Sequence, residues 1–199
     1  METAESILEF WFGANPDDGI LAKEQARLWW AKNSETDEEI RKRYKIYVSK
    51  AADGELSHWQ STPRGCLALI LLTDQFPRNI FRATANAFAF DAKALAWSLA
   101  GIAAGFDLKL RPVERTFFYL PLEHSESLAH QDRSVELFSA LATCVEELQR
   151  APFIEYHTFA ERHREVIERF GRFPHRNEIL GRESTPEELA FLKEPGSTF

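Results

Sequence analysis

Apolar side chains recur at three- and four-residue intervals along most of this sequence, and no segment shows sustained alternation of apolar and polar residues. Recurrence at that interval places apolar groups on one stripe of an α-helix, whereas alternation would place them on one face of a strand. The clearest stripes lie within residues 134–149 and 152–171. We therefore predict an all-α protein without a sheet, in which short connections make neighbouring helices antiparallel, as in stacked helical hairpins.

Local start and stop signals predict where the helices begin and end. Thr62 precedes Pro63, which is a favoured helix start, and Thr36 with Glu39 has the pattern of a capping box. Pro77 is expected to end one helix, and Pro121 to interrupt another. These signals predict helices over residues 3–13, 21–32, 36–54, 63–76, 91–104, from 112 with an interruption at 121, 134–149, 152–171 and 186–193.

The helix that contains Cys66–Leu72 is apolar on all sides, which is typical of a helix at the centre of a protein. Asp74 lies near its C-terminal end, where the helix dipole disfavours a negative charge. We therefore predict that a cation pairs with Asp74, either Arg78 or an arginine from a later stretch.

The length and charge of the chain limit the classes of function. The 199 residues fit one helical domain, 1–199, with a loose tail from about residue 194. A net charge of −7 argues against bulk nucleic-acid binding, which needs a basic face. Residues 1–10 hold no basic segment of a signal peptide, and no apolar run approaches the ~20 residues of a membrane span, so a cytoplasmic protein is expected. Cys66 and Cys144 are expected to be buried, reduced thiols.

Two similar stretches concentrate the polar groups that bind anions. Residues 169–182 read RFGRFPHRNEILGR, with four arginines and a single acid, and residues 74–82 read DQFPRNIFR. Guanidinium groups form forked, charge-assisted hydrogen bonds to carboxylates and phosphates. The residues predicted to bind a ligand are Asp74, Arg78, Asn79, Arg172, His175, Arg176 and Asn177. A structural alternative stays open, in which these side chains cap helix ends and pair with protein carboxylates. Whether the two stretches reflect an internal duplication also stays open.

Three further residues are candidates for acid–base catalysis. Glu123 and His124 lie in the segment LPLEHSE, and His163 lies on the apolar stripe of its helix. A histidine beside a carboxylate can act as a general base near neutral pH. The alternative is that each is a satisfied interior polar group. No metal site and no cofactor are predicted, because the common fingerprints of both are missing from the sequence.

Several long strings resemble one bacterial family, the family of domain of unknown function 924. These strings are ILEFWFG, LTDQFPRNIFR, AFAFDAKAL, ERTFFYLPLEHSE and RFGRFPHRNEILGRESTPEE. The resemblance extends from Ile7 to about Leu192. It implies an all-helical domain of the tetratricopeptide-like superfamily, with its helical hairpins stacked in an α/α superhelix. It implies no activity and supplies no catalytic residues.

Three hypotheses for function follow from the sequence. The first is a binding module for an anionic small molecule or an acidic peptide, held in a groove lined by arginine, histidine and asparagine. The second is a metal-independent hydrolase or lyase in which Glu123 or His124 acts as the acid–base group and an arginine anchors the substrate. The third is that the two motifs are purely structural.

Overall fold

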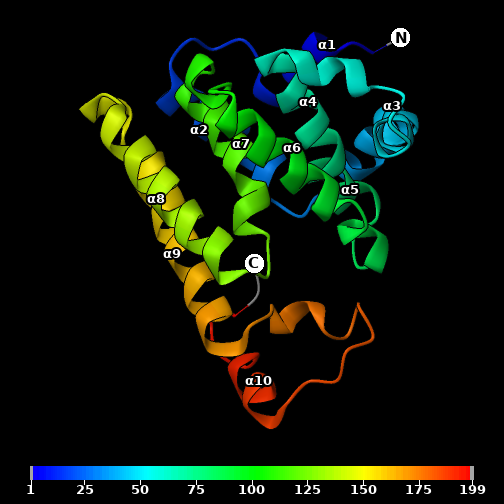
Figure 1. The fold of residues 1–199 in the computed structure, drawn as a ribbon, viewed down its shortest axis with the longest axis vertical. Helices are drawn as coiled ribbons and strands as arrows, with labels where there is room; N and C mark the ends of the chain where they lie inside the picture. The colour runs from blue at the N-terminus through cyan, green and yellow to red at the C-terminus, as the bar shows by residue number, and fades with distance from the viewer. Residues whose placement is uncertain (1, 198–199) are drawn as a thin grey trace.

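The computed structural model describes residues 2–197, and every regular element among them is a helix (Figure 1). The α-helices are α1 (Ala4–Phe12), α2 (Asp18–Trp30), α3 (Ser34–Ala52), α4 (Pro63–Thr73), α5 (Gln75–Ile80), α6 (Asp91–Ala103), α7 (Pro112–Glu123), α8 (Leu128–Cys144), α9 (Ala151–Phe170) and α10 (Pro186–Phe191). The 3-10 helices are η1 (Ser57–Ser61), η2 (Ala85–Phe88), η3 (Asp107–Lys109), η4 (Glu147–Gln149) and η5 (Pro174–Arg176). The predicted all-α class without a sheet is confirmed for this part of the chain, whereas the stacking of hairpins into a superhelix stays a prediction.

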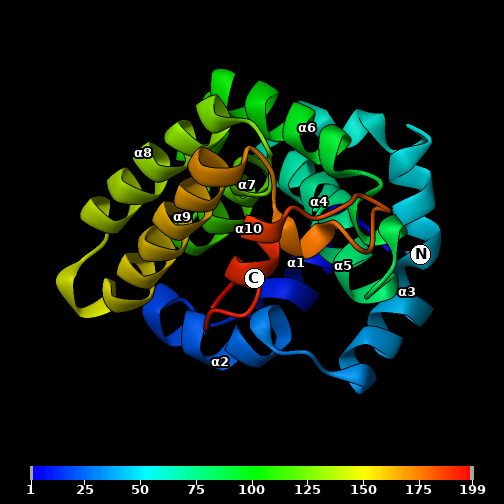
Figure 2. The ribbon, with the colours of Figure 1, turned by 90° about the horizontal axis from the view of Figure 1, so that it is seen from below.

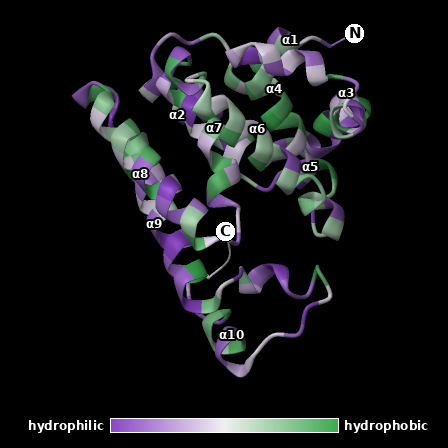
Figure 3. Cartoon of the chain, in the orientation of Figure 1, coloured by the Kyte–Doolittle hydropathy of each residue, from purple (hydrophilic) through white to green (hydrophobic). Residues whose placement is uncertain are grey.

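Helix α4 lies at the centre of the main body, as its sequence predicts. Thr62 caps it by accepting a hydrogen bond from the N–H of Gly65, and Pro63 occupies the first turn. From Gly65 to Thr73 every side chain of α4 is buried, and the helix packs against α1, α3, α6 and α7. Figure 2 shows these helices around α4, and Figure 3 shows that α4 and α7 are more hydrophobic than α9.

Two predicted boundaries are wrong near the start of α3 and at Pro77. Helix α3 is capped by Asn33, which accepts from the N–H groups of Glu35 and Thr36, so the predicted capping box at Thr36 is not the start. Pro77 does not end the helical path, because α5 begins at Gln75 and runs through it. A proline is tolerated there, since the N–H groups of a first turn have no partner within the helix.

Helix α7 runs through Pro121, and the helix after it begins at Leu128 rather than at residue 134. The end of α7 is stabilised from α8 by Gln131, whose side-chain amide donates to the carbonyls of Glu123, at 2.6 Å, and Ser125, at 2.7 Å. Gln131 is fully buried. The turn between α7 and α8 is therefore held by a side chain from the following helix.

The chain after α9 forms an arm, residues 171–197, that packs onto the end of α9 through a small hydrophobic cluster. Gly171 ends α9 in the left-handed conformation, with φ of 69°. Val166, Ile167 and Phe173 form a buried cluster separate from the main core, with Phe170 and Phe191 packed against it. Figures 1 and 2 place this arm beneath the C-terminal end of α7, on the side of the body that carries α5.

The two cysteines differ in their environment. Cys66 is buried in α4, as predicted, but Cys144 is exposed at the last residue of α8, so the prediction that both are buried is wrong for Cys144. None of the helices within residues 2–197 combines the length and the apolar character needed to cross a membrane.

Candidate functional site

Asp74 lies at the break between α4 and α5 and is fully buried. Its carboxylate accepts hydrogen bonds from His124 Nδ1 at 2.7 Å and from Gln75 Nε2 at 2.5 Å. Arg78 Nη1 lies 3.4 Å from Asp74 Oδ1, so the predicted pairing of Asp74 with Arg78 is confirmed. The charge of Arg78 offsets the negative charge of Asp74, which the dipole at the C-terminal end of α4 disfavours.

The charges around Asp74 fix its protonation and that of His124. Burial by itself would raise the pKa of Asp74, but Arg78 and His124 hold it well below its usual range. Burial and the charge of Arg78 lower the pKa of His124, although Asp74 opposes them. At neutral pH the pair is therefore a carboxylate and a neutral imidazole whose Nδ1 donates to Asp74, which leaves the lone pair on Nε2.

Arg78 connects this pair to the start of α6. Its two terminal nitrogens bind the carboxylate of Asp91 at 3.0 and 3.1 Å, a forked arrangement. The sequence predicts a helix from residue 91, and the structure places Phe90 at the cap of α6 and Asp91 in the first turn. Asp91 is thus a member of the site that sequence reasoning missed, although an acid at a helix start close to an F-P-R motif was a usable signal.

Arg176 approaches the same place from the C-terminal arm. It lies in η5 and is only 7% exposed. Its Nη1 donates to the backbone carbonyl of His124 at 3.0 Å and lies 3.6 Å from Asp91 Oδ2. Its guanidinium carbon lies 4.4 Å from the ring centroid of Phe173 and 4.8 Å from that of Phe88. We call Asp74, Arg78, Asp91, His124 and Arg176 the junction cluster.

Burial and the charge of Arg78 lower the pKa of Arg176 to about 10, so the side chain is still a cation at neutral pH. Its Nε is buried and has no hydrogen-bond partner among residues 2–197. A buried guanidinium with a free donor is unusual, because an unpaired polar group loses its hydration without compensation.

Glu123 and His163 form a second buried pair beside the junction cluster. His163 Nδ1 lies 3.3 Å from Glu123 Oε1 and 2.8 Å from the carbonyl of Phe159. Burial, and then the charge of Asp74, raise the pKa of Glu123 to about 8. Burial lowers the pKa of His163 to about 3. Both groups are therefore predominantly neutral at pH 7.

The remaining predicted residues are placed differently. His175 is half-buried, with its ring centroid 5.6 Å from that of Phe173, and burial and Arg176 lower its pKa to about 4. Asn79 faces α3, where it donates to Asp37 at 2.9 Å. Arg172 and Asn177 both donate to Glu188 of α10. The structure thus brings Asp74, Arg78 and Arg176 together with His124, and does not bring Asn79, Arg172 or Asn177 to them.

Two hollows on the described surface lie away from the junction cluster. The smaller, of about 190 Å³, lies beside α4 and α6 and is lined by Gln60, Cys66, Trp97, Ala100, Gly101, Ala104 and Phe106. The larger lies over one face of α3. Within residues 2–197 no group of three or more histidine, cysteine, aspartate or glutamate side chains is arranged to hold a metal ion.

Comparison with known proteins identifies the family. The model of a family described as bacterial protein of unknown function (DUF924) matches residues 7–196. The chain belongs to this family. A solved structure of a protein of unknown function from Agrobacterium tumefaciens is 39% identical, covers 96% of each chain and has a TM-score of 0.80. A search of curated proteins gives no match. Membership of DUF924 thus fixes the family and the fold but brings no activity with it.

Proposed function

We propose that this protein binds a small anionic molecule, or the acidic end of a peptide, at the junction cluster. The observation that carries this proposal is the incomplete pairing of Arg176. It is buried, it donates to one backbone carbonyl, and its Nε is left without a partner within residues 2–197. A carboxylate or phosphate that accepts from this guanidinium would satisfy the free donor.

The other arginines of the two motifs provide the contrast. Four of them form a fork to a protein carboxylate, and the pairs are Arg78 with Asp91, Arg82 with Asp37, Arg172 with Glu188 and Arg182 with Glu126. The fifth, Arg169, donates to Glu187 through Nε at 3.0 Å. Arg176 instead lies 3.6 Å from Asp91, beyond the length of a charge-assisted hydrogen bond. Asp91 is already occupied by Arg78, so no protein carboxylate forms a close fork with Arg176 within residues 2–197.

The packing of the cluster supports a small ligand. The side chains of Arg78 and Asp91 are each 21% exposed, and that of His124 is 13% exposed. An anionic group that fits among them belongs to a small molecule or a chain end rather than to an extended surface. The aromatic contacts of Arg176 with Phe88 and Phe173 fix the plane of its guanidinium, and a preorganised donor costs less entropy on binding.

The experiment is a thermal-shift titration of the wild-type protein with inorganic phosphate, small mono- and dicarboxylates, and short peptides that end in aspartate or glutamate. A ligand at one hundred times its Kd stabilises the fold by about 2.7 kcal/mol, which is a readable shift in Tm. We expect Arg176→Gln to abolish the shift. Arg172→Gln is the matched control, because it breaks an arginine–carboxylate fork in the same arm without touching the cluster.

A structural role for Arg176 predicts a different result. Arg176 Nη1 and the amide of Gln131 both donate to backbone carbonyls at the C-terminal end of α7. A cation at this end of a helix also complements the helix dipole. If no probe shifts the Tm of the wild type while Arg176→Gln melts well below it, the binding proposal is wrong and the arginine serves to lock the arm to the body.

A further inference from the structure

His124 has the arrangement of a general base. Asp74 holds Nδ1 at 2.7 Å, and Asp74 is itself fixed by Gln75 and Arg78, so the imidazole is locked in the tautomer that carries its lone pair on Nε2. A carboxylate in this position also stabilises the imidazolium that forms when Nε2 accepts a proton. The geometry is that of an oriented base, and no hydrogen bond within residues 2–197 uses Nε2.

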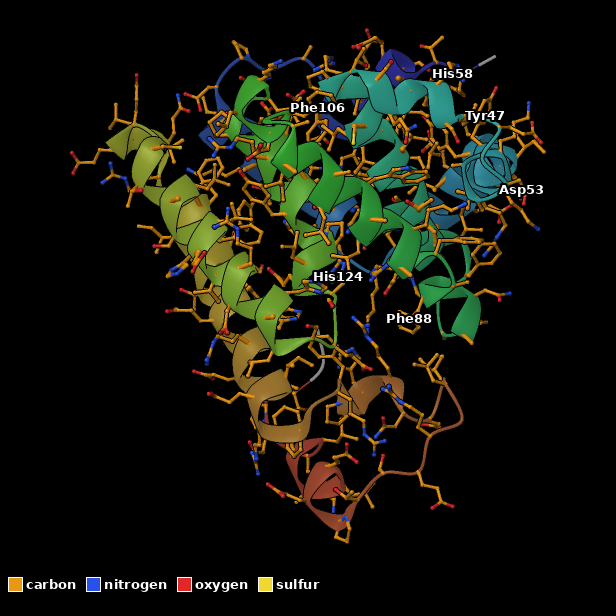
Figure 4. All side chains as sticks on the ribbon, viewed as in Figure 1. Tyr47, Asp53, His58, Phe88, Phe106 and His124 are labelled. Carbon is orange, nitrogen blue, oxygen red and sulfur yellow. The ribbon has the colours of Figure 1, made fainter. Side chains whose placement is uncertain are left out.

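Nε2 is open to a ligand. It has no hydrogen-bond partner among the described residues, and the side chain is 13% exposed. Figure 4 shows His124 at the end of α7 and Phe88 farther along the body, both on the side that faces the C-terminal arm. Arg176 reaches this side from the arm and donates to the backbone carbonyl of His124. The guanidinium of Arg176 is therefore a direct neighbour of the residue that carries the base nitrogen.

We propose that His124 is a catalytic general base, and that its substrate is a small 2-oxo acid held by Arg176. This inference rests on the proposed anion site and assigns it a substrate class. A planar guanidinium fork matches the two oxygens that the carboxylate and the ketone of a 2-oxo acid present side by side. The most acidic hydrogens of such a molecule lie on C3, next to the ketone, close to the anchored group.

The step is a proton transfer without a change of oxidation state. Nε2 of His124 takes the proton from C3, and the electron pair of the C–H bond moves to form the enolate, whose negative oxygen is on C2. The cation of Arg176 stabilises that oxygen, and the carboxylate of Asp74 stabilises the imidazolium. Return of a proton from the imidazolium to C3 regenerates the substrate, so in heavy water the protein exchanges hydrogen at C3 for deuterium.

Glu123 and His163 do not take part in this step. Both are almost fully buried, and His163 Nδ1 is engaged by the carbonyl of Phe159. Their position behind His124 makes them part of the packing on which the base rests. Of the three catalytic candidates in the sequence, the geometry selects His124.

The test is exchange of C3 hydrogens measured by proton NMR in heavy water, with pyruvate, 2-oxobutyrate and 2-oxoglutarate as the probes. We expect the wild-type protein to remove the C3–H signal of at least one probe at least tenfold faster than buffer alone. His124→Gln should return the rate to that of buffer. His130→Gln is the matched control, because His130 is a half-buried histidine that bonds Ser125 and lies outside the cluster.

The outcomes separate this inference from the proposed function. Suppose a 2-oxo acid raises the Tm of the wild type but not of Arg176→Gln, and no exchange exceeds that in buffer; the anion site then stands and His124 is not a base. Exchange that survives in His124→Gln overturns the assignment in the same way. If none of the three probes binds or exchanges, the substrate class is wrong. Each variant is first compared with the wild type by circular dichroism, and His124→Asn replaces His124→Gln if the latter does not fold.

Discussion

Glu123 makes the stability of this protein depend on pH at the level of a single residue. Its pKa is raised from 4.5 to about 8 in the fold, so between these values the native state holds a proton that the unfolded chain has released. Stability therefore decreases as pH rises through this range. The cause is the burial of a carboxyl group beside the charge of Asp74.

We predict that Glu123→Gln stabilises the protein at alkaline pH. The amide keeps the shape of the neutral carboxyl group but cannot ionise, so its advantage over the wild type should grow from pH 4.5 to about 8 and reach about 1–3 kcal/mol. Urea unfolding at several pH values measures the difference. An advantage that is the same at every pH would contradict the assigned cause.

Two histidines, the buried His163 and the half-buried His175, make stability depend on pH on the acid side. Burial lowers the pKa of His163 to about 3 and that of His175 to about 4, both from 6.5. Below pH 6.5 the unfolded chain therefore binds protons at these histidines that the native state does not bind. The free energy of unfolding then decreases as pH falls. We predict that His175→Asn reduces this acid sensitivity by about 1–2 kcal/mol at pH 4, measured by the same unfolding series.

At the residue scale the sequence predicted the local pairs and missed the distant ones. The pairing of Asp74 with Arg78 follows from a spacing of four residues and a helix end, both of which are readable in the sequence. The partners of Arg172 and Asn177 are in α10, and the partner of Asn79 is in α3. The sequence predicts that an arginine pairs with a carboxylate, but which carboxylate it pairs with depends on the fold.

At the scale of the elements, the two Thr-Pro start signals were confirmed, whereas the two prolines expected to end or interrupt a helix were not. Thr62-Pro63 and Thr185-Pro186 begin α4 and α10 as predicted, because the capping bonds form within a few residues. Pro77 and Pro121 fail as stops, since Pro77 lies in a first turn and Pro121 is enclosed by the packing around α7. The cost of a proline inside a helix is offset by tertiary contacts that a local pattern does not contain.

The contact between α6 and α7 depends on the missing side chain of Gly101. A Cβ added there would overlap the ring of Phe118, which is fully buried. We predict that Gly101→Ala lowers the free energy of unfolding by about 1–3 kcal/mol, because the added methyl group overpacks the interface. Denaturant midpoints measure the effect. Ala100→Ser, which adds one atom on the exposed side of the same helix, should change stability by less than about 0.5 kcal/mol.

At the scale of the whole molecule, the C-terminal arm is attached to the end of α7 and the turn after it by polar contacts. Glu126 accepts a fork from Arg182 and a hydrogen bond from the N–H of Phe173, and a small hydrophobic cluster packs Phe173 and Phe191 onto the end of α9. We predict that Glu126→Gln speeds amide hydrogen exchange in residues 173–191 about tenfold, which corresponds to ~1.4 kcal/mol, while exchange in α4 stays unchanged. Glu168→Gln removes an exposed ion pair to Arg164 and is the control. Equal acceleration in the arm and in α4 would show that the two parts open together.

The overall fold was predictable further than the site was. Helical class follows from the apolar spacing, and the long shared strings pointed to the DUF924 family that the comparison identifies. The position of the arm was not predictable, because it depends on contacts between Arg176 and His124 and between Arg182 and Glu126 across more than fifty positions of the chain. The stacking of the hairpins into a superhelix and the binding residues stay predictions.

The separation in sequence between these partners has a consequence for folding kinetics. The hairpin of α8 and α9 closes through a short connection, whereas Arg176 meets His124 across 52 positions and Arg182 meets Glu126 across 56. Contacts that close long loops tend to form late, after the entropy of closure has been offset by local structure. Weakening them therefore changes the unfolding rate more than the folding rate. On this view the lifetime of the native state, rather than the speed of reaching it, is decided where the arm meets the body.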